Sequence, residues 1–527
     1  MNTREYEVAD FNDLKDGEMK NVKVNEQEIL LTRIDGKIYA LGAHCTHYGA
    51  PLNKGVLSGD RIVCPWHHAC FNARSGELEE PPALDALPHF EVTRKDDKIF
   101  VTLPQQIPHS RTPKMARNDP GRDDRVFVVL GAGAAGNMAA QTLREDGFNG
   151  KIIMITRENR LPYDRPNLSK DYLQGEAEEE WMPLRDKSFF EIHDIELRLG
   201  ATVSGVDSKS RTVTFEDGSS LEYDKILLAT GGTPQKLDVP GNDLENIFYL
   251  RTFDNADSII TAAEKAKRAL VVGSGFIGME TAFSLKKRGL QVTVVTKEEI
   301  PFQSKLGSSL GKVFQKEHEK NGITFFTKSG VKEFTGNGKV EAVILENGKR
   351  LEADMVLLGL GVEPVTDYLK SLPLEDDGSI KTNAYFRAAE NLFAVGDIAS
   401  FPLLEEGRLI RIEHWRTAEQ HGRTAAHNML GKDVKYTAVP FFWTNQFDLK
   451  LRYVGYASDW DEELVRGSLE KQDFIVFYLK DGKVLAAAGN NRNREMDAVS
   501  ELMRLDKMPG RERLEDDSTD FVQLLKS

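Results

Sequence analysis

The segment Val126-Phe-Val-Val-Leu-Gly-Ala-Gly-Ala-Ala-Gly136 decides the fold of the largest part of this chain. An apolar, β-branched run enters a glycine-rich turn and is followed by small residues, which predicts a strand, a tight turn and a helix. The first glycine, Gly131, allows the sharp turn, Gly133 lets the backbone approach a pyrophosphate, and Gly136 lets the helix pack closely on the strand. The positive end of the helix dipole would then face the phosphates. The segment therefore predicts a dinucleotide-binding fold.

The residues that follow support this interpretation. A second apolar strand is expected over residues 151–155, and Glu158 comes directly after it. In dinucleotide-binding folds a carboxylate at this position binds the ribose hydroxyls. A glycine motif alone is weak evidence, but a strand, turn, helix, second strand and acid in this order are specific.

The same pattern occurs a second time over residues 269–285, with glycines at Gly273, Gly275 and Gly278. Another strand is expected over residues 291–295, which indicates a second dinucleotide-binding fold. After this strand, Glu298 could bind a ribose, whereas Lys297 could pair with a 2′-phosphate, so the choice between NADH and NADPH stays open. We favour NADH. A solvated surface charge is an equally good interpretation of either Lys297 or Glu298.

Near the N-terminus, two short clusters, Cys45-Thr-His47 and Cys64-Pro-Trp-His67, each contain one cysteine and one histidine. Thiolates and imidazoles suit zinc or an iron-sulfur cluster. Structural zinc sites usually show C-x₂-C or H-x₃₋₅-H spacing, which these clusters lack. The spacing therefore favours a cluster whose one iron is bound by sulfur and whose other iron is bound by nitrogen.

Composition limits the classes of function. The 527 residues leave room for three or four domains, and the formal net charge of −14 argues against nucleic acid or an anionic membrane as the main partner. Cys70 is the third and last cysteine, so no disulfide framework is expected. The N-terminus lacks a signal pattern and no apolar run is long enough to span a bilayer, so we expect a soluble, cytoplasmic protein without membrane insertion.

The two Cys/His clusters resemble those of the Rieske [2Fe-2S] family, whose ligands match Cys45, His47, Cys64 and His67. The respiratory branch of that family has a disulfide between the two loops, and this chain cannot form one. Ala69 and Phe71 stand where the high-potential branch places hydroxyl donors. Without those donors we expect a low midpoint potential, roughly −150 mV.

The remainder resembles the two-dinucleotide flavoproteins that include ferredoxin reductases and apoptosis-inducing factor. The resemblance depends on both glycine motifs and on strand ends at 227–232, 359–364 and 392–397. It implies that the first fold holds FAD and the second holds NAD(P). The implied cofactor contacts are Gly131, Gly133, Ala135, Gly136, Glu158, Arg165, Lys170, Val203, Thr230, Gly231, Asp397, His414, Trp415, Gly273, Gly275, Ile277, Gly278, Glu280, Lys297 and Gly361.

The resemblance also implies roles near the flavin ring. It places Lys170 near flavin N5 and pairs it with Glu280, so that a cation stabilises the reduced flavin. Trp415 is expected against the flavin ring or the nicotinamide, with a packing role in the core as the competing interpretation. Trp443 has two interpretations, a contact with the flavin or a packing role.

We therefore predict a multidomain protein: an antiparallel β Rieske domain, two α/β dinucleotide-binding (Rossmann-like) domains and a C-terminal α+β domain. The expected boundaries are 1–103 for the Rieske domain, 104–124 for a linker, 125–245 and 366–432 for the FAD domain, 246–365 for the NAD(P) domain and 433–527 for the C-terminal domain.

The predicted function is an NAD(P)H:acceptor oxidoreductase that passes electrons from NADH through FAD to the Rieske cluster and on to an oxygenase, a haem protein or a small carrier. No cysteine pair stands beside the flavin, which excludes the disulfide-reducing branch. A siroheme nitrite reductase would need more cysteines. Two alternatives remain: a redox-sensing interaction protein with slow NADH oxidation, and a purely structural iron site. The oligomeric state is open, with a homodimer as one option.

Overall fold

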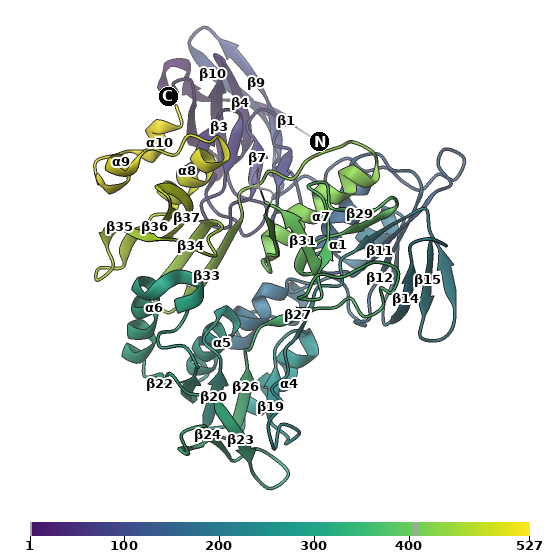
Figure 1. Cartoon of the computed structure of the whole chain (residues 1–527). Helices are drawn as coiled ribbons and strands as arrows, with labels where there is room; N and C mark the ends of the chain where they lie inside the picture. Colours follow the sequence, from purple (N-terminus) through teal and green to yellow (C-terminus); the bar gives the residue numbers. More distant parts are fainter. Residues whose placement is uncertain (1–2, 404–407, 527) are drawn as a thin grey trace.

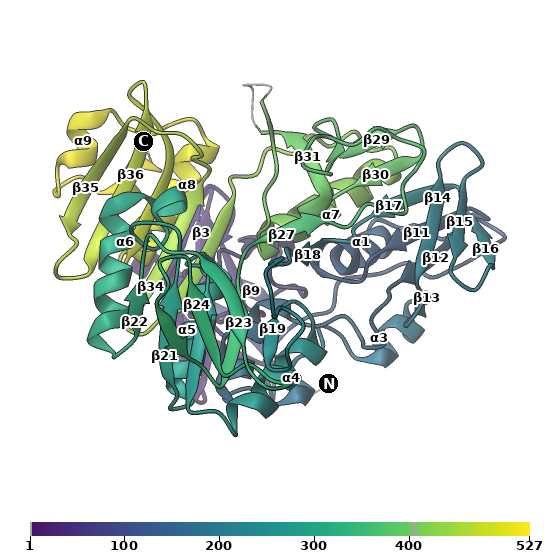
Figure 2. The same ribbon diagram turned by 60° about the horizontal axis from the view of Figure 1, so that its bottom comes forward.

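The computed structural model describes residues 3–403 and 408–526. Figure 1 shows the N-terminal β domain beside the C-terminal domain, with the two dinucleotide folds on other sides of the molecule. Figure 2 shows the first dinucleotide fold opposite the C-terminal sheet, with the second fold in front. In the described part of the chain, no helix combines the length and the apolar character needed to cross a membrane.

The N-terminal domain contains two antiparallel sheets. The larger has the order β1-β10-β9-β4-β3-β2, and its strand β10 alternates between buried and less buried residues, as expected of a strand with one face on a core. Its strands are β1 (Thr3–Asp10), β2 (Glu18–Val24), β3 (Gln27–Ile34), β4 (Lys37–Gly42), β9 (His89–Lys95) and β10 (Lys98–Pro104). The smaller, which we call the cluster sheet, contains β5 (Val56–Ser58), β6 (Arg61–Val63), β7 (Cys70–Asn72) and β8 (Leu78–Glu80).

The first dinucleotide fold is a mainly parallel sheet of order β13-β12-β11-β17-β30-β29. Its strands are β11 (Val126–Leu130), β12 (Lys151–Ile155), β13 (Ile195–Arg198), β17 (Lys225–Leu228), β29 (Arg387–Ala389) and β30 (Leu392–Ala394). β17 pairs in parallel with β30 although the second fold separates them in the sequence. Helices α1 (Ala134–Glu145) and α7 (Trp415–Met429) pack against each other. The chain therefore leaves this fold and returns to it. A side sheet contains β14 (Val203–Asp207), β15 (Thr212–Phe215) and β16 (Ser220–Glu222).

The second dinucleotide fold is a parallel sheet of order β19-β26-β20-β21-β22. Its strands are β19 (Ile247–Tyr249), β20 (Arg268–Val272), β21 (Gln291–Val295), β22 (Thr324–Phe326) and β26 (Met355–Leu358), with helices α4 (Phe253–Ala263), α5 (Phe276–Lys287) and α6 (Gln303–Lys320). A side sheet contains β23 (Val331–Thr335), β24 (Ala342–Leu345) and β25 (Arg350–Glu352). The antiparallel pair β18 (Gly232–Pro234) and β27 (Val362–Pro364) joins the two folds.

The C-terminal domain is an antiparallel sheet of order β33-β34-β37-β36-β35, followed by helices. Its elements are β33 (Phe441–Gln446), β34 (Leu449–Gly455), β35 (Glu462–Ser468), β36 (Asp473–Lys480), β37 (Lys483–Asn490), α8 (Asn493–Arg504), α9 (Arg511–Glu515) and α10 (Phe521–Leu524). The remaining elements are short: α2 (Asp171–Gln174), α3 (Lys187–Ile192), β28 (Ile380–Lys381), β31 (Ala399–Pro402), β32 (Leu409–Ile410) and the 3₁₀ turns η1 (Phe11–Asp13), η2 (Leu52–Lys54), η3 (Arg165–Ser169), η4 (Glu179–Trp181) and η5 (Gly396–Ile398).

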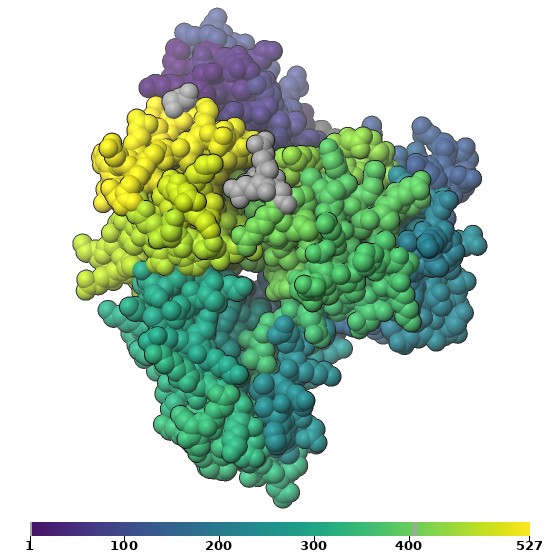
Figure 3. Space-filling view, in the orientation of Figure 1, coloured from purple at the N-terminus to yellow at the C-terminus, as the bar shows by residue number. Residues whose placement is uncertain are grey.

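The cluster sheet and the C-terminal domain share one hydrophobic core. Val56, Val63 and Cys70 pack with Phe441 and Val499 in a single buried cluster. Figure 3 shows the N-terminal and C-terminal surfaces in contact. Because burial of apolar surface stabilises both partners at once, the cluster sheet is held firmly on the rest of the molecule.

Candidate active site

A cavity of about 730 Å³ lies where the two dinucleotide folds meet the C-terminal sheet. Most of the cofactor contacts expected from the sequence line it: Gly131, Gly133, Ala135, Glu158, Arg165, Lys170, Val203, Thr230, Gly231, Gly275, Ile277, Glu280, Gly361, Asp397, His414 and Trp415. Gly136, Gly273, Gly278 and Lys297 are not on its wall. Trp443, whose role the sequence left open, lines the cavity as well. The structure thus brings together residues that are up to about 300 positions apart.

The first glycine motif has the geometry that a bound pyrophosphate needs. Gly131 has φ +109°, and a Cβ there would lie 2.1 Å from the carbonyl oxygen of Ala229. A Cβ on Gly136 would lie 1.8 Å from the carbonyl oxygen of Gly131, so the helix can pack only on glycine. Around Gly133, in contrast, no described residue other than the glycine and its two chain neighbours has an atom within 4 Å of the Cβ position. The backbone there is open to a ligand, and the fold fits FAD.

Glu158 is held at the end of β12 by two donors. Its carboxylate accepts hydrogen bonds from the Tyr163 hydroxyl at 2.6 Å and the Arg165 guanidinium at 2.7 Å. Burial alone would raise the pKa of Glu158, but Arg165 and Tyr163 bring it below its usual value. The residue is therefore an anion with one orientation, suited to accept ribose hydroxyl donors.

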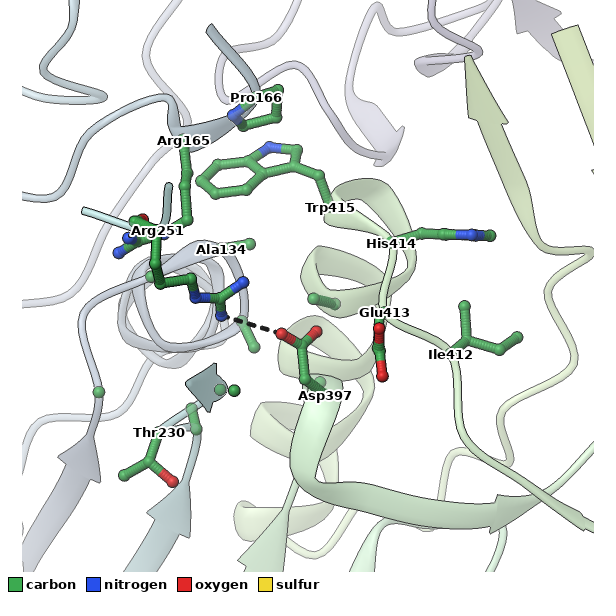
Figure 4. A pocket seen from close by; sticks show the side chains of 18 of the residues that line it. Ala134, Arg165, Pro166, Thr230, Arg251, Asp397, Ile412, Glu413, His414 and Trp415 are labelled. Atoms are coloured by element: carbon green, nitrogen blue, oxygen red, sulfur yellow. Dashed lines mark hydrogen bonds and ion pairs between the residues drawn. The ribbon is translucent and has the colours of Figure 1, made fainter. Parts of the chain in front are cut away.

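Asp397, at the Gly-Asp turn, forms an ion pair that the sequence did not predict. The Arg251 guanidinium donates to its carboxylate at 2.9 Å (Figure 4). Arg251 comes just before α4, and its own carbonyl oxygen accepts from Arg165. Figure 4 also shows Trp415 beside Arg165 and Pro166. Arg251 had no motif around it, so only the folded chain reveals its place in the wall.

Lys170 and Glu280 meet as expected. The Lys170 ammonium donates to Glu280 Oε2 at 2.7 Å, and the Ser169 hydroxyl donates to the same oxygen at 2.6 Å. The other oxygen, Oε1, accepts from the Thr444 hydroxyl at 2.7 Å. Glu280 is only 3% exposed, so a full set of donors offsets the cost of burying its charge. Ser169 and Thr444 were not identified from the sequence.

Glu298 and Lys297, the two candidate nucleotide-binding residues after β21, have different surroundings. Glu298 is fixed, because its carboxylate accepts from the Ser274 hydroxyl at 3.0 Å and the Ser304 backbone N–H at 3.1 Å. The Lys297 side chain is 79% exposed and lies 3.7 Å from Glu346. A carboxylate, rather than a cation, is therefore positioned beside the second glycine motif.

His414 is on the cavity wall and packs against the C-terminal sheet. Its ring centroid is 4.3 Å from that of Phe442. Burial lowers the pKa of His414 to about 4, so the imidazole is neutral at pH 7. It can act as a hydrogen-bond partner there without adding charge.

The two Cys/His loops have matching backbone geometry. In the first, between β4 and η2, the Cys45 N–H donates to the Ala50 carbonyl at 2.8 Å; in the second, between β6 and β7, the Cys64 N–H donates to the Ala69 carbonyl at 2.9 Å. Both cysteines are buried. Two similar turns thus present one thiol and one imidazole each to a common space.

The donor atoms are grouped in a way that suits two irons. His47 Nδ1 and His67 Nδ1 lie 3.2 Å apart, and the Cys64 thiol interacts with that of Cys45. Burial lowers the pKa of both imidazoles, that of His47 to about 3, so both are neutral donors. Within the described ranges, no three His, Cys, Asp or Glu side chains converge on a single ion position. The residues fit a cluster with two sulfur and two nitrogen ligands.

The cluster loops rest directly on the flavin side of the molecule. Tyr48 donates to Asp164 and accepts from the Asn167 amide at 2.8 Å, both in the segment that leads to Lys170. On the other side, the ring centroids of His67 and Trp443 are 4.4 Å apart. This placement of the Rieske domain relative to the flavin could not be predicted from the sequence.

Buried ion pairs hold the same interface. Glu80, at the end of β8, accepts from Arg61 at 2.5 Å, from Arg416 at 2.6 Å and from the Gln420 amide at 2.6 Å. Burial alone would raise the pKa of Glu80, but Arg61 and Arg416 hold it well below its usual range. Arg416 and Gln420 belong to α7, so the ion pairs join the cluster sheet to the first dinucleotide fold.

Comparisons with known proteins agree with this arrangement. Three family models match in chain order: the Rieske [2Fe-2S] domain over residues 4–91, pyridine nucleotide-disulphide oxidoreductase over residues 125–422, and the reductase C-terminal domain over residues 441–525. The chain is 39% identical over 510 residues to apoptosis-inducing factor 3 of Mus musculus, a match that covers 95% of this chain and 84% of that protein.

A bacterial relative and a solved structure cover the part after the Rieske domain. Rhodocoxin reductase of Rhodococcus erythropolis is 33% identical over 379 residues, 72% of this chain and 89% of that protein. The crystal structure of the covalent putidaredoxin reductase–putidaredoxin complex matches with a TM-score of 0.73 and 31% identity, and covers 76% of this chain and 98% of that one.

The chain belongs to the pyridine nucleotide-disulphide oxidoreductase family and carries an N-terminal Rieske domain. It is an oxidoreductase of the ferredoxin reductase kind, with FAD, a Rieske [2Fe-2S] cluster and NADH as its cofactors. The expected fold class and cofactors are thereby confirmed.

Proposed function

We propose that this chain is an NADH-dependent reductase in which electrons pass from FAD to the chain's own Rieske cluster and from there to an external acceptor. When bound, FAD supplies the link between two-electron hydride chemistry and the one-electron chemistry of the cluster. Each NADH brings two electrons, so the cluster must be reduced and reoxidised twice per NADH. The chain's own residues position both centres.

The position of Trp443 carries the proposal. Its side chain lines the cavity that fits FAD, and its ring centroid lies 4.4 Å from that of His67, a proposed cluster ligand. One aromatic residue therefore borders both the cavity and a proposed cluster ligand. A structural iron site would need no such contact.

Charged residues on the cavity wall support hydride transfer. The Lys170 ammonium, fixed 2.7 Å from Glu280, would stabilise the negative charge of a reduced flavin. Glu158 and Asp397 are fixed by Arg165 and Arg251, so the hydroxyl-binding carboxylates are oriented before a ligand arrives. We assign Lys170 and Glu280 the role of shaping the surface where hydride arrives.

We infer a preference for NADH from the end of β21. Glu298, held by Ser274 and Ser304, is suited to the ribose hydroxyls and would repel a 2′-phosphate. We expect E298Q to raise the KM for NADH and to reduce the difference between the KM values for NADH and NADPH. Lys297→Gln is the matched control, because that side chain is exposed; equal effects of the two substitutions would contradict the assignment.

The names of relatives support the class of acceptor. Several are reductases of oxygenase systems, such as the anthranilate 1,2-dioxygenase system ferredoxin–NAD(+) reductase component of Burkholderia cepacia. We propose an oxygenase, a haem protein or a small redox carrier as the acceptor here. The Rieske cluster would be the centre that this acceptor meets.

Stopped-flow reduction of the purified protein by NADH tests the proposal. We expect the flavin absorbance to bleach first and the cluster absorbance to follow at a rate independent of protein concentration. Flavin bleaching without cluster bleaching would reject the transfer. Slow NADH oxidation with a long-lived charge-transfer band would instead support the redox-sensing alternative, which also fits a relative of apoptosis-inducing factor 3.

A further inference from the structure

Strands β33 and β34 bring two side chains from the C-terminal domain to the cluster loops. Trp443 on β33 is the register partner of Arg452 on β34. Residues directly opposite each other in an antiparallel pair project from the same face of the sheet. Trp443 contacts His67, so Arg452 lies on the face that is turned toward the cluster.

Arg452 is a buried cation with no carboxylate at ion-pair distance among the described residues. It is 5% exposed, and its Nε has no hydrogen-bond partner among the described residues. Its Nη1 reaches only long contacts, to Asn445 Oδ1 at 3.4 Å and to the carbonyl oxygens of Lys450 and Leu451 at 3.3 and 3.5 Å. Over residues 3–403 and 408–526, no acidic oxygen lies within the 4.0 Å of an ion pair. Burying such a charge is costly unless a negative group compensates it.

Two buried acidic groups act on this guanidinium from beyond ion-pair distance, Asp497 more strongly and Cys64 less strongly. The positive charges of Arg452 and Lys170 also act on His67. The Oδ1 atom of Asp497 lies 3.2 Å from Nδ1 of His68. The guanidinium therefore acts on a sulfur ligand from one loop and on the imidazole ligand of that same loop.

A Rieske cluster gains negative charge when it is reduced. Two ferric ions, two sulfides and two thiolates sum to no net charge, so one added electron leaves a single negative charge on the cluster. A nearby cation in a medium of low dielectric constant stabilises that form more than the oxidised form. Charge and hydrogen bonds around a cluster are among the factors that set its potential.

We propose that Arg452 sets the potential of the Rieske cluster from outside the Rieske domain: the buried guanidinium stabilises the reduced cluster and raises its midpoint potential. Arg452 would act on the cluster through its positive charge and would not ligate an iron. The electron that reduces the iron pair comes from NADH, and no atom of Arg452 is oxidised or reduced. The inference requires the cluster but not the proposed order of electron flow, because a midpoint potential is an equilibrium quantity.

Redox titration of the full-length protein, followed by the EPR signal of the reduced cluster, tests the inference. We expect R452Q to make cluster reduction at least tenfold less favourable, which is about 59 mV for one electron. R452K keeps the charge and should keep most of the wild-type potential. Lys450→Gln removes an exposed cation from the same strand and should change nothing.

The flavin absorbance in the same titration provides an internal reference, since its midpoint should move less than that of the cluster. If R452Q does not retain the cluster, R452M fills the same buried space without charge and is compared with R452K. A wild-type cluster potential in the neutral variant would overturn the inference. So would a potential in R452K as low as in the neutral variant, because the guanidinium would then act through packing. Failure of flavin-to-cluster transfer in stopped flow, with these shifts intact, would reject only the proposed function.

Discussion

The two faces of the β33–β34 strand pair contact different redox sites. On one face, Phe442 packs on Phe276 of the NAD fold with centroids 4.7 Å apart, and Thr444 donates to Glu280. On the other, Phe441 stacks on His68 at 4.7 Å and Trp443 contacts His67. Because successive strand residues point to opposite faces, two adjacent strands serve both sites.

The buried charged side chains on the two faces differ in their partners. Near the flavin site, the Glu280 carboxylate is saturated by Lys170, Ser169 and Thr444. Near the cluster, Arg452 has no carboxylate at ion-pair distance among the residues that the structure describes. The flavin face therefore holds a preformed ion pair. Under our proposal, the cation on the cluster face would stabilise the negative charge that the cluster gains on reduction.

The largest expected effect comes from removing a sulfur ligand on the cluster face. We expect C64S to lose the cluster completely while FAD binding and flavin reduction by NADH remain. Iron and sulfide analysis, with EPR after reduction, measures the loss. C70S is the matched control, because Cys70 is buried in β7, directly after the second cluster loop, and lies outside the donor set. Equal iron loss in both variants would contradict the ligand assignment.

The next effect concerns the contact that joins the two faces. Replacing Trp443 by Leu removes the aromatic ring between the cavity and His67, and we expect flavin-to-cluster transfer to slow at least tenfold, about 1.4 kcal/mol in the barrier. Stopped flow separates this step from flavin reduction, which should keep its rate. W460F serves as a control on the same domain. An unchanged transfer rate would show that electrons take another route.

A smaller effect is expected on the flavin face alone. T444V leaves Glu280 Oε1 buried without its donor, which costs about 1–3 kcal/mol. We expect slower flavin reduction by NADH and a lower unfolding temperature, with an unchanged cluster potential. A shifted cluster potential would mean that the two faces are coupled and do not serve their redox sites independently. Thr335→Val, at a partly buried hydroxyl far from the cavity, controls for the substitution itself.

The smallest effect concerns pH and His414. Burial lowers its folded-state pKa to about 4 from 6.5, so the unfolded chain binds this proton more readily. Stability from this group is therefore present above pH 6.5 and is lost as the pH falls toward 4. Between pH 6.5 and 5.5 the loss is about 1 kcal/mol. Denaturant unfolding at both pH values should show this difference shrinking in H414Q but not in the exposed-site variant H109Q.

Sequence reasoning worked best where function depends on short, contiguous motifs. The glycine turns at Gly131 and Gly273, and the Cys/His loops, are local patterns whose chemistry requires their spacing. The pairing of Lys170 with Glu280 came from resemblance, and the structure shows that pair at 2.7 Å. The assignment of Glu298, rather than Lys297, to the choice between NADH and NADPH remains a prediction.

The contacts that sequence reasoning missed join residues far apart in the chain. Arg251 meets Asp397 and Tyr48 meets Asp164 only because separate folds pack together. Arg452 lies on the same face as Trp443 through the register of two strands, which neither composition nor periodicity specifies. Tertiary packing decides such contacts, and a single sequence contains no local signal for them.

The common hydrophobic core of the cluster sheet and the C-terminal domain has a kinetic consequence. Where a reductase and its ferredoxin are separate molecules, each electron waits for a diffusional encounter, and delivery slows on dilution. Here the cluster sheet and the reductase part form one folded body, so the fold fixes the effective concentration of one site at the other. Under the proposed function, internal electron delivery would then be first order and insensitive to expression level, and only the final acceptor would have to collide with the protein.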